Sequence, residues 1–112
     1  MPHDDRVYLE HIRDAILRVE QYTEGIDQSE FKRQILIQDG VIRQIEIIGE
    51  AVKRLSSSYC SSHPDTPWQD IARMRDKLIH GYFGVDIEKV WLTVKDDLPP
   101  LKAEVLSSLS AA

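Results

Sequence analysis

The sequence predicts an all-α protein: a single domain over residues 1–112, folded as an up-and-down bundle of four main helices. Apolar residues recur at three- and four-residue steps along four segments, which is the spacing of one buried helix face. The connections between these segments are short, which favours antiparallel packing of neighbouring helices. No segment shows the apolar–polar alternation of a half-buried strand.

Composition indicates a globular protein whose surface is not broadly adapted to nucleic acid. Apolar residues make up 42% and charged residues 29% of the chain, which argues against disorder. The net charge of −5 excludes a broadly basic surface, so any contact with nucleic acid must be local. A single cysteine excludes an intrachain disulfide and fits a reducing compartment. Because we find neither a signal peptide nor an apolar run that could span a membrane, we expect a cytoplasmic protein.

The first helix is expected from about Asp4 to Thr23. Asp4 or Asp5 can cap its start, because a carboxylate at that position accepts a free backbone N–H. Gly25 follows the last turn and is a common helix stop. The apolar stripe of this helix contains Ile12, Ala15, Ile16 and Val19.

The second helical pattern runs to about Ser57 and begins at a predicted capping box, Asp27–Glu30. Gly40 weakens its middle and is expected to mark the junction between a short helix and a longer one. Gly49 and Ala51 allow a neighbouring helix to approach closely, which places Glu50 near a packed seam. Two interpretations of Glu50 remain open: an ordinary exposed acid, or a carboxylate that faces Arg75 or His80.

Residues 56–67 are expected to form a loop, because they are rich in serine and contain two prolines. Cys60 and His63 lie close enough in sequence to suggest metal ligands. Without a second pair of ligands a chance pairing is favoured, and we expect no metal and no cofactor. Asp65 or Thr66 is expected to cap the next helix, since Pro67 suits a first turn.

The third helix is expected to end near His80, because Gly81 follows. Its apolar stripe contains Trp68, Ile71, Ala72, Leu78 and Ile79. Arg75 lies four residues after Ile71 and four before Ile79, so this spacing places it inside the stripe. One interpretation is a structural arginine that pairs with a carboxylate or extends its head to water. The other is an anion site at a helix–helix or subunit contact.

The last helix is expected to begin at Asp86. Pro99 and Pro100 interrupt its pattern, but the apolar phase continues beyond them, so we expect a kink or a fresh start. The tail over residues 107–112 is expected to fray.

One spacing carries chemistry: Arg75, four residues, His80, one residue and Tyr82. It gathers an always-charged guanidinium, a group that titrates near neutral pH and a phenol at one predicted helix end. An isolated histidine at a helix end is usually a capping residue, which favours a structural role. The combination with arginine and tyrosine instead suits phosphate chemistry.

Two parts of the chain resemble the HepT-like branch of the HEPN superfamily, formerly the family of unknown function DUF86. They are the run over residues 67–86 and the later pieces Val90-Trp91 and Asp97-Leu98-Pro99. Residues 48–51 resemble that family as well, so the similarity covers nearly the whole chain. The resemblance implies an all-helical, HEPN-like homodimer, and dimerisation would also help a core of this modest size.

The resemblance further implies a function. HepT-like proteins are toxins of HepT/MntA-type (type VII) toxin–antitoxin pairs, and they cleave RNA without a metal. The catalytic pair, contributed by both subunits to a cleft at the dimer interface, maps to Arg75 and His80. The polar residue that often follows the arginine is Asp76. The partner is an MntA-like nucleotidyltransferase antitoxin, which transfers AMP to the motif tyrosine, here Tyr82.

The residues can support this chemistry. RNA is cleaved without metal when its own 2′-hydroxyl attacks the adjacent phosphorus, which requires a base and an acid. His80 can take either role, and Arg75 can bind the phosphate through two hydrogen bonds. Asp76 lies four residues before His80, so on a continuous helix it would share a face and could orient the imidazole. AMP on Tyr82 would place bulk and negative charge in the path of RNA.

Two other classes of function remain. The first is a non-catalytic HEPN-type module that binds and regulates a partner nucleotidyltransferase. The second is a plain dimeric helical scaffold in which Arg75 forms a structural ion pair.

Overall fold

A computed structural model describes residues 4–80 and 84–111, and for Ile79 and His80 it describes the backbone alone. The described residues form α1 (Asp5–Thr23), α2 (Gln28–Arg33), α3 (Ile35–Lys53), α4 (Ser57–Ser62), α5 (Trp68–Ala72), α6 (Met74–Leu78), β1 (Ile79–His80), β2 (Gly84–Val85), α7 (Ile87–Leu92), a π-helical turn (Thr93–Asp97) and α8 (Leu98–Ser110).

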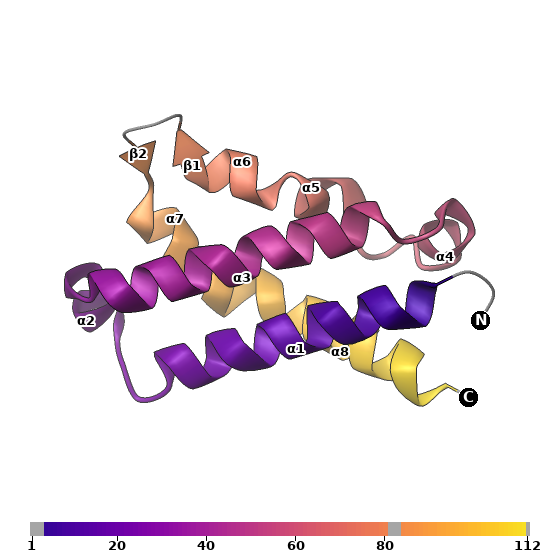
Figure 1. The fold of residues 1–112 in the computed structure, drawn as a ribbon, viewed down its shortest axis with the longest axis horizontal. Coiled ribbons are helices and arrows are strands. Elements are labelled where there is room, and N and C mark those ends of the chain that lie inside the picture. Colours follow the sequence, from indigo (N-terminus) through magenta and orange to yellow (C-terminus); the bar gives the residue numbers. More distant parts are fainter. Residues whose placement is uncertain (1–3, 81–83, 112) are drawn as a thin grey trace.

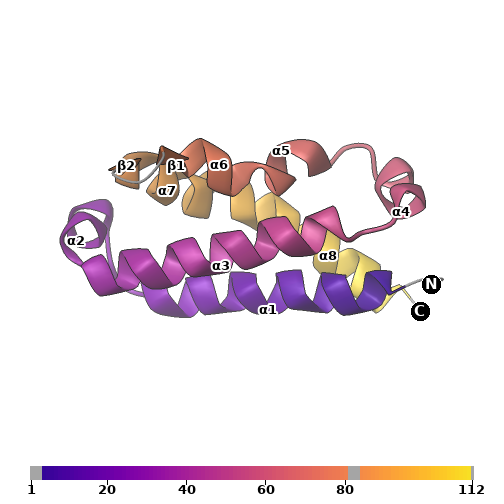
Figure 2. The same ribbon diagram turned by 45° about the horizontal axis from the view of Figure 1, so that its top comes forward.

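The helices form an up-and-down bundle, which confirms the predicted all-α class (Figure 1). Helices α1 and α3 run antiparallel, α5 and α6 return along α3, and α7 with α8 run back to the end at which α1 begins (Figures 1 and 2). Helix α1 packs along both α3 and α8. Every described helix is too short or too polar to cross a membrane. The homodimer remains a prediction.

The start of α1 differs from the expectation. Asp4 occupies the cap position without a side-chain capping bond. Asp5 is instead 2% exposed, and its carboxylate accepts hydrogen bonds from the backbone N and the Oγ of Ser56, at 2.7 and 2.6 Å. It therefore ties the first turn of α1 to the start of α4. The predicted apolar stripe is confirmed, and Leu9 extends it.

The second segment breaks at Gln34 and not at Gly40. The predicted cap is present, because the Asp27 side chain accepts the backbone N–H of Glu30 at 2.8 Å. Gln38 explains the position of the break: its Nε2 donates to carbonyls at the end of α2, including that of Phe31 at 2.8 Å. Such carbonyls lack helical partners and need others. Gly40 lies within α3, where the ring of Tyr22 packs against it.

The segment expected to be a loop contains a short helix, α4, which the Ser56 side chain caps by accepting the N–H of Tyr59. The expectation that Asp65 or Thr66 caps the next helix is wrong. Pro67 occupies that position, and the Thr66 hydroxyl donates to Glu104 at 3.3 Å.

The third helix is divided at Arg73 and ends at Leu78, before His80. Ile79 and His80 instead pair with Val85 and Gly84 in a two-residue antiparallel ladder. A ladder this short has too few residues to show strand periodicity. The buried positions of α5 and α6 are Trp68, Ile71, Met74 and Leu78.

The last helical region begins as predicted, because the Asp86 side chain accepts the N–H of Lys89 at 3.1 Å. The expected kink or fresh start is a π-helical turn: α8 follows it directly from Leu98 with both prolines in its first turn, and the backbone at Asp97 and Leu98 stays helical. Proline is tolerated there because first-turn N–H groups need no helical partner. The expected fraying of residues 107–112 is wrong for 107–110, which form the last turn of α8, whereas Ala111 lies beyond the helix.

Candidate functional site

Arg75 lies on the surface of α6, which corrects its predicted place inside the apolar stripe. Its side chain is 48% exposed. The stripe passes through Met74, so Arg75 is rotated by one residue, about 100°, away from the core. The exposed guanidinium is therefore accessible to an anion from solvent.

Two carboxylates contact the guanidinium. Nε of Arg75 donates to Oε2 of Glu46 at 3.1 Å, and Nη1 lies 3.5 Å from Oδ1 of Asp76. The first contact is a good charged hydrogen bond, and the second is at the outer limit of one. A guanidinium carries five N–H donors in a planar fork, so these contacts leave donors for a further ligand.

Glu46 is the functional candidate that sequence reasoning missed. It lies on α3, 29 residues from Arg75 in the chain. The backbones of α3 and α5 approach closely beside it: a Cβ at Gly49 would lie 3.2 Å from the carbonyl oxygen of Ala72. Gly49 was correctly predicted to allow such an approach. Glu46 lies three residues earlier, on the same side of α3, which is the signal that could have identified it.

Glu50 is exposed and pairs with Lys53 at 3.5 Å. The interpretation as an exposed acid therefore describes its position. Glu50 does not pair with Arg75, because Glu46 is the α3 carboxylate that contacts the guanidinium; that it faces His80 stays a prediction, since the His80 side chain lies outside the described residues.

Asp76 is exposed and contacts its neighbour Arg75. The expectation that it shares a helical face with His80 is wrong, because α6 ends at Leu78 and His80 lies in β1. The His80 side chain, and Gly81 and Tyr82 entirely, fall outside what the structure describes. The meeting of Arg75, His80 and Tyr82 stays a prediction.

The Cys60–His63 pair lacks the further ligands of a metal centre: the described residues contain no group of three histidine, cysteine, aspartate or glutamate side chains placed to hold an ion. Nδ1 of His63 lies 2.8 Å from the carbonyl oxygen of Tyr59, and the two rings stack with centroids 4.2 Å apart. Burial raises the pKa of the Cys60 thiol, which disfavours the thiolate that binds metals.

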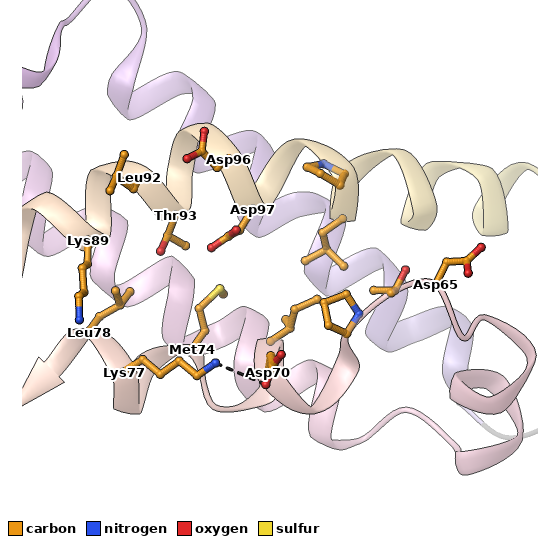
Figure 3. Close-up of a pocket in the computed structure, with 15 residues that line it drawn as sticks. Asp65, Asp70, Met74, Lys77, Leu78, Lys89, Leu92, Thr93, Asp96 and Asp97 are labelled. Atoms are coloured by element: carbon orange, nitrogen blue, oxygen red, sulfur yellow. Dashed lines mark ion pairs between the residues drawn. The ribbon is translucent and has the colours of Figure 1, made fainter.

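A groove of about 800 Å³ lies on another face of α6, between α5–α6 and the π-helical turn with its flanking helices (Figure 3). We call it the π-turn groove. Met74, Lys77 and Leu78 line it, whereas Arg75 does not. Helix α6 therefore presents Arg75 beside α3 and a different set of side chains to the groove.

Comparison with known proteins gives one consistent family. A model described as "Ribonuclease HepT-like" matches residues 12–107. A probable ribonuclease HepT from Thermococcus cleftensis is 46% identical over 93% of this chain and 94% of its own length. A candidate RNase from Caldanaerobacter subterraneus is 40% identical over 89% of each chain. A Methanocaldococcus jannaschii protein, named as a gamma-glutamylcyclotransferase and candidate RNase, is 44% identical over 95% of this chain but only 48% of its own length. No solved structure matches significantly.

Proposed function

The chain belongs to the ribonuclease HepT-like family, and from this premise we propose that it is a metal-independent ribonuclease, the toxin of a HepT/MntA-type pair. The observation that carries the proposal is the exposed guanidinium of Arg75 on α6, held by Glu46 of α3. The backbone continues from there into β1, which contains His80. The arginine and the histidine of the motif are thus only one turn and a short strand apart.

The reaction we propose is transfer of the phosphodiester to the RNA's own 2′-oxygen. A base removes the 2′-hydroxyl proton, the 2′-oxygen bonds to phosphorus, and the bond from phosphorus to the 5′-oxygen breaks. An acid then protonates the leaving 5′-oxygen, so the products are a 2′,3′-cyclic phosphate and a 5′-hydroxyl. His80 is proposed as base or acid, and Arg75 binds the phosphate oxygens on which charge accumulates.

Glu46 gives Arg75 a defined orientation in this scheme. Because the Glu46 carboxylate accepts from Nε, the terminal nitrogens keep donors for a phosphate, with Nη1 also 3.5 Å from Oδ1 of Asp76. Arginine binds phosphate best through two parallel hydrogen bonds, which requires a fixed plane. Glu46 is therefore a positioning residue in this proposal, while Arg75 touches the substrate.

Substitution of the two motif residues tests the proposal. Arg75→Ala and His80→Ala should each abolish cleavage of RNA and toxicity on expression, with circular dichroism and thermal unfolding close to wild type. Arg18→Ala is a matched control, because Arg18 is exposed on α1 outside the motif. If either motif variant cleaves RNA at the wild-type rate, the mechanism is wrong.

We further propose that two copies combine their motif residues in one cleft. Ile35 and Leu36, adjacent at the start of α3, are 69% and 84% exposed. They lie at the same end of the bundle as β1 and β2 (Figure 1). Neighbouring exposed apolar side chains favour burial by a partner. Leu36→Glu should convert the dimer to monomer in sedimentation and remove activity, while Leu17→Glu on α1 should do neither. Wild-type sedimentation as a monomer at assay concentration would refute the shared cleft.

The proposed antitoxin is an MntA-like nucleotidyltransferase, and Tyr82 is its proposed target. Transfer replaces the phenolic proton by AMP and releases pyrophosphate from ATP. After co-expression with the neighbouring nucleotidyltransferase gene, intact mass should increase by one or more AMP units, and Tyr82→Phe should remove the increase. An unmodified wild-type chain would count against this step.

A non-catalytic module that regulates a nucleotidyltransferase is the second candidate. The Arg75–Glu46 ion pair does not distinguish it from the ribonuclease, since an arginine without a catalytic role would form the same pair. Tight binding to the nucleotidyltransferase, together with unchanged growth and intact RNA on expression, would favour it.

A further inference from the structure

We propose that the π-turn groove is a docking site for a basic amphipathic helix of a partner protein. The inference goes beyond the ribonuclease proposal and does not require it. One wall of the groove is formed by α5 and α6, and the other by the π-helical turn and the ends of α7 and α8 (Figure 3). A groove between two helical walls is the kind of surface that an amphipathic helix can occupy.

Apolar side chains provide the contact surface of the groove. Ile71, Met74, Leu78 and Leu101 form its floor and are largely buried in the bundle, so the exposed apolar contact comes mainly from Leu92. Leu92 also lines it and is 51% exposed, although it lies between two buried residues of the bundle, Trp91 and Thr93. A helix with apolar residues at three- and four-residue steps would cover this surface.

The charge of the groove selects a cationic partner. Asp97 points from the π-helical turn into the groove, while Asp96 lies on the outer side of the same wall (Figure 3). Neither carboxylate forms an ion pair within the part of the chain that the structure describes. Across the groove, Asp70 pairs with Lys77 at 3.4 Å, which uses one of the two lysines that line it. The rim is therefore acidic in excess.

Asp97 also lies in an environment that disfavours its charge. Partial burial is the larger cause of its raised pKa and the charge of Asp96 the next, and both outweigh the opposing effects of Lys77 and a hydrogen bond with Thr93. A lysine or arginine placed in the groove would remove this penalty. RNA is disfavoured as the occupant, because its phosphates would meet like charge.

The π-helical turn itself supports a binding role. Each π turn accommodates an additional residue and carries a cost in regular packing, and such turns are frequent at functional sites. Here it places Thr93 and Asp97 at the groove, and the first-turn proline Pro100 continues the same wall. An uninterrupted α-helix would change the direction of these side chains.

A synthetic peptide provides the test. The probe is a fluorescein-labelled helix of about 16 residues, roughly 24 Å long, with leucines along one face and lysines beside them. One control peptide carries glutamate in place of lysine, and another has the same composition in an order that breaks the apolar face. Fluorescence anisotropy measures binding to the full chain.

We expect saturable binding of the basic peptide alone, and a Kd at least about tenfold weaker for the double variant Asp96→Asn/Asp97→Asn. The matched double variant Glu24→Gln/Asp39→Asn removes the same charge at exposed positions outside the groove, so it should bind within about twofold of wild type. Added salt should weaken binding to wild type more than to Asp96→Asn/Asp97→Asn.

Equal affinity for wild type and Asp96→Asn/Asp97→Asn, or equal binding of the glutamate peptide, would overturn the proposal. If Asp96→Asn/Asp97→Asn changes the sedimentation of the chain without peptide, the groove binds a second copy of the chain. That result would also overturn the proposal. Leu92→Ser, which removes an exposed apolar contact, provides a second variant and should weaken peptide binding. Both groove variants should cleave RNA as the wild type does. Failure of the docking proposal can therefore be told apart from failure of the ribonuclease proposal.

Discussion

Substitution of Glu46 separates its positioning role from a simple surface ion pair. The two side chains are 48% and 33% exposed, so the pair should contribute no more than about 1 kcal/mol to the free energy of unfolding. Effects on catalysis larger than this must come from the orientation of Arg75 or from charge at the phosphate site. Glu46→Gln and Glu46→Ala divide these two contributions.

Glu46→Gln keeps an oxygen to accept the Nε–H of Arg75 but removes the negative charge. A phosphate on the far edge of the guanidinium would lie about 7 Å from that charge, where two unit charges in water repel by about 0.6 kcal/mol. Removing this repulsion should lower KM for RNA about threefold at low salt, with kcat unchanged, and less at physiological salt. Glu46→Ala also removes the acceptor, so the guanidinium loses its fixed plane and kcat should fall about tenfold.

The assay is cleavage of a fluorogenic RNA under single-turnover and steady-state conditions, at two salt concentrations. Glu24→Gln, at an exposed position beyond α1, provides the control for loss of one negative charge. If Glu46→Ala keeps the wild-type kcat, the ion pair does not position Arg75, and this part of the mechanism is refuted. A loss in Glu46→Gln as large as that in Glu46→Ala would show that charge, and not the acceptor, is required.

Three further predictions concern stability. Asp5→Ala removes the acceptor of two short hydrogen bonds from Ser56 and should lower the free energy of unfolding in urea by about 3 kcal/mol; a loss under about 0.5 kcal/mol would contradict it. The pKa of Asp97 is raised above its unfolded value of 3.8, so its contribution to stability is full below that value and is lost as pH rises through the folded pKa. Asp97→Asn should therefore stabilise the protein near neutral pH but not in acid. Equal shifts of the thermal unfolding temperature at both pH values would refute this. Gly49→Val should force α3 away from the carbonyl of Ala72 and lower the free energy of unfolding by about 1–3 kcal/mol in the same urea titration. An unchanged free energy of unfolding would contradict the close approach.

Features fixed by neighbouring residues were predictable from the sequence. The caps at Asp27 and Asp86 depend on a carboxylate and a backbone N–H three residues later, so both were identified before the structure was known. The apolar stripe of α1 repeats over several turns and was predicted for the same reason. The all-α class follows from such local signals combined.

Features decided by contacts that the repeating apolar pattern does not record were not predictable in this way. The break at Gln34 depends on the side chain of Gln38 reaching back to α2, and the early end of α6 depends on pairing of β1 with β2. The periodicity around Arg75 also misled, because α5 and α6 are separate helices divided at Arg73 and the stripe passes through Met74. Choice of Glu46 over Glu50 as the partner of Arg75 required the register between α3 and α6, which no local pattern contains.

The separation of charge on α6 resolves the apparent conflict between a net charge of −5 and an RNA substrate. Arg75 is presented beside α3, whereas the acidic π-turn groove lies on a different face of the same helix. The acidic wall repels phosphates, so it disfavours RNA on the groove face, which is consistent with Arg75 on another face as the proposed anion site. The same wall attracts a basic protein segment. An acidic chain can thus bind RNA at one place and a cationic partner at another, provided that α6 keeps these two sets of side chains on separate faces.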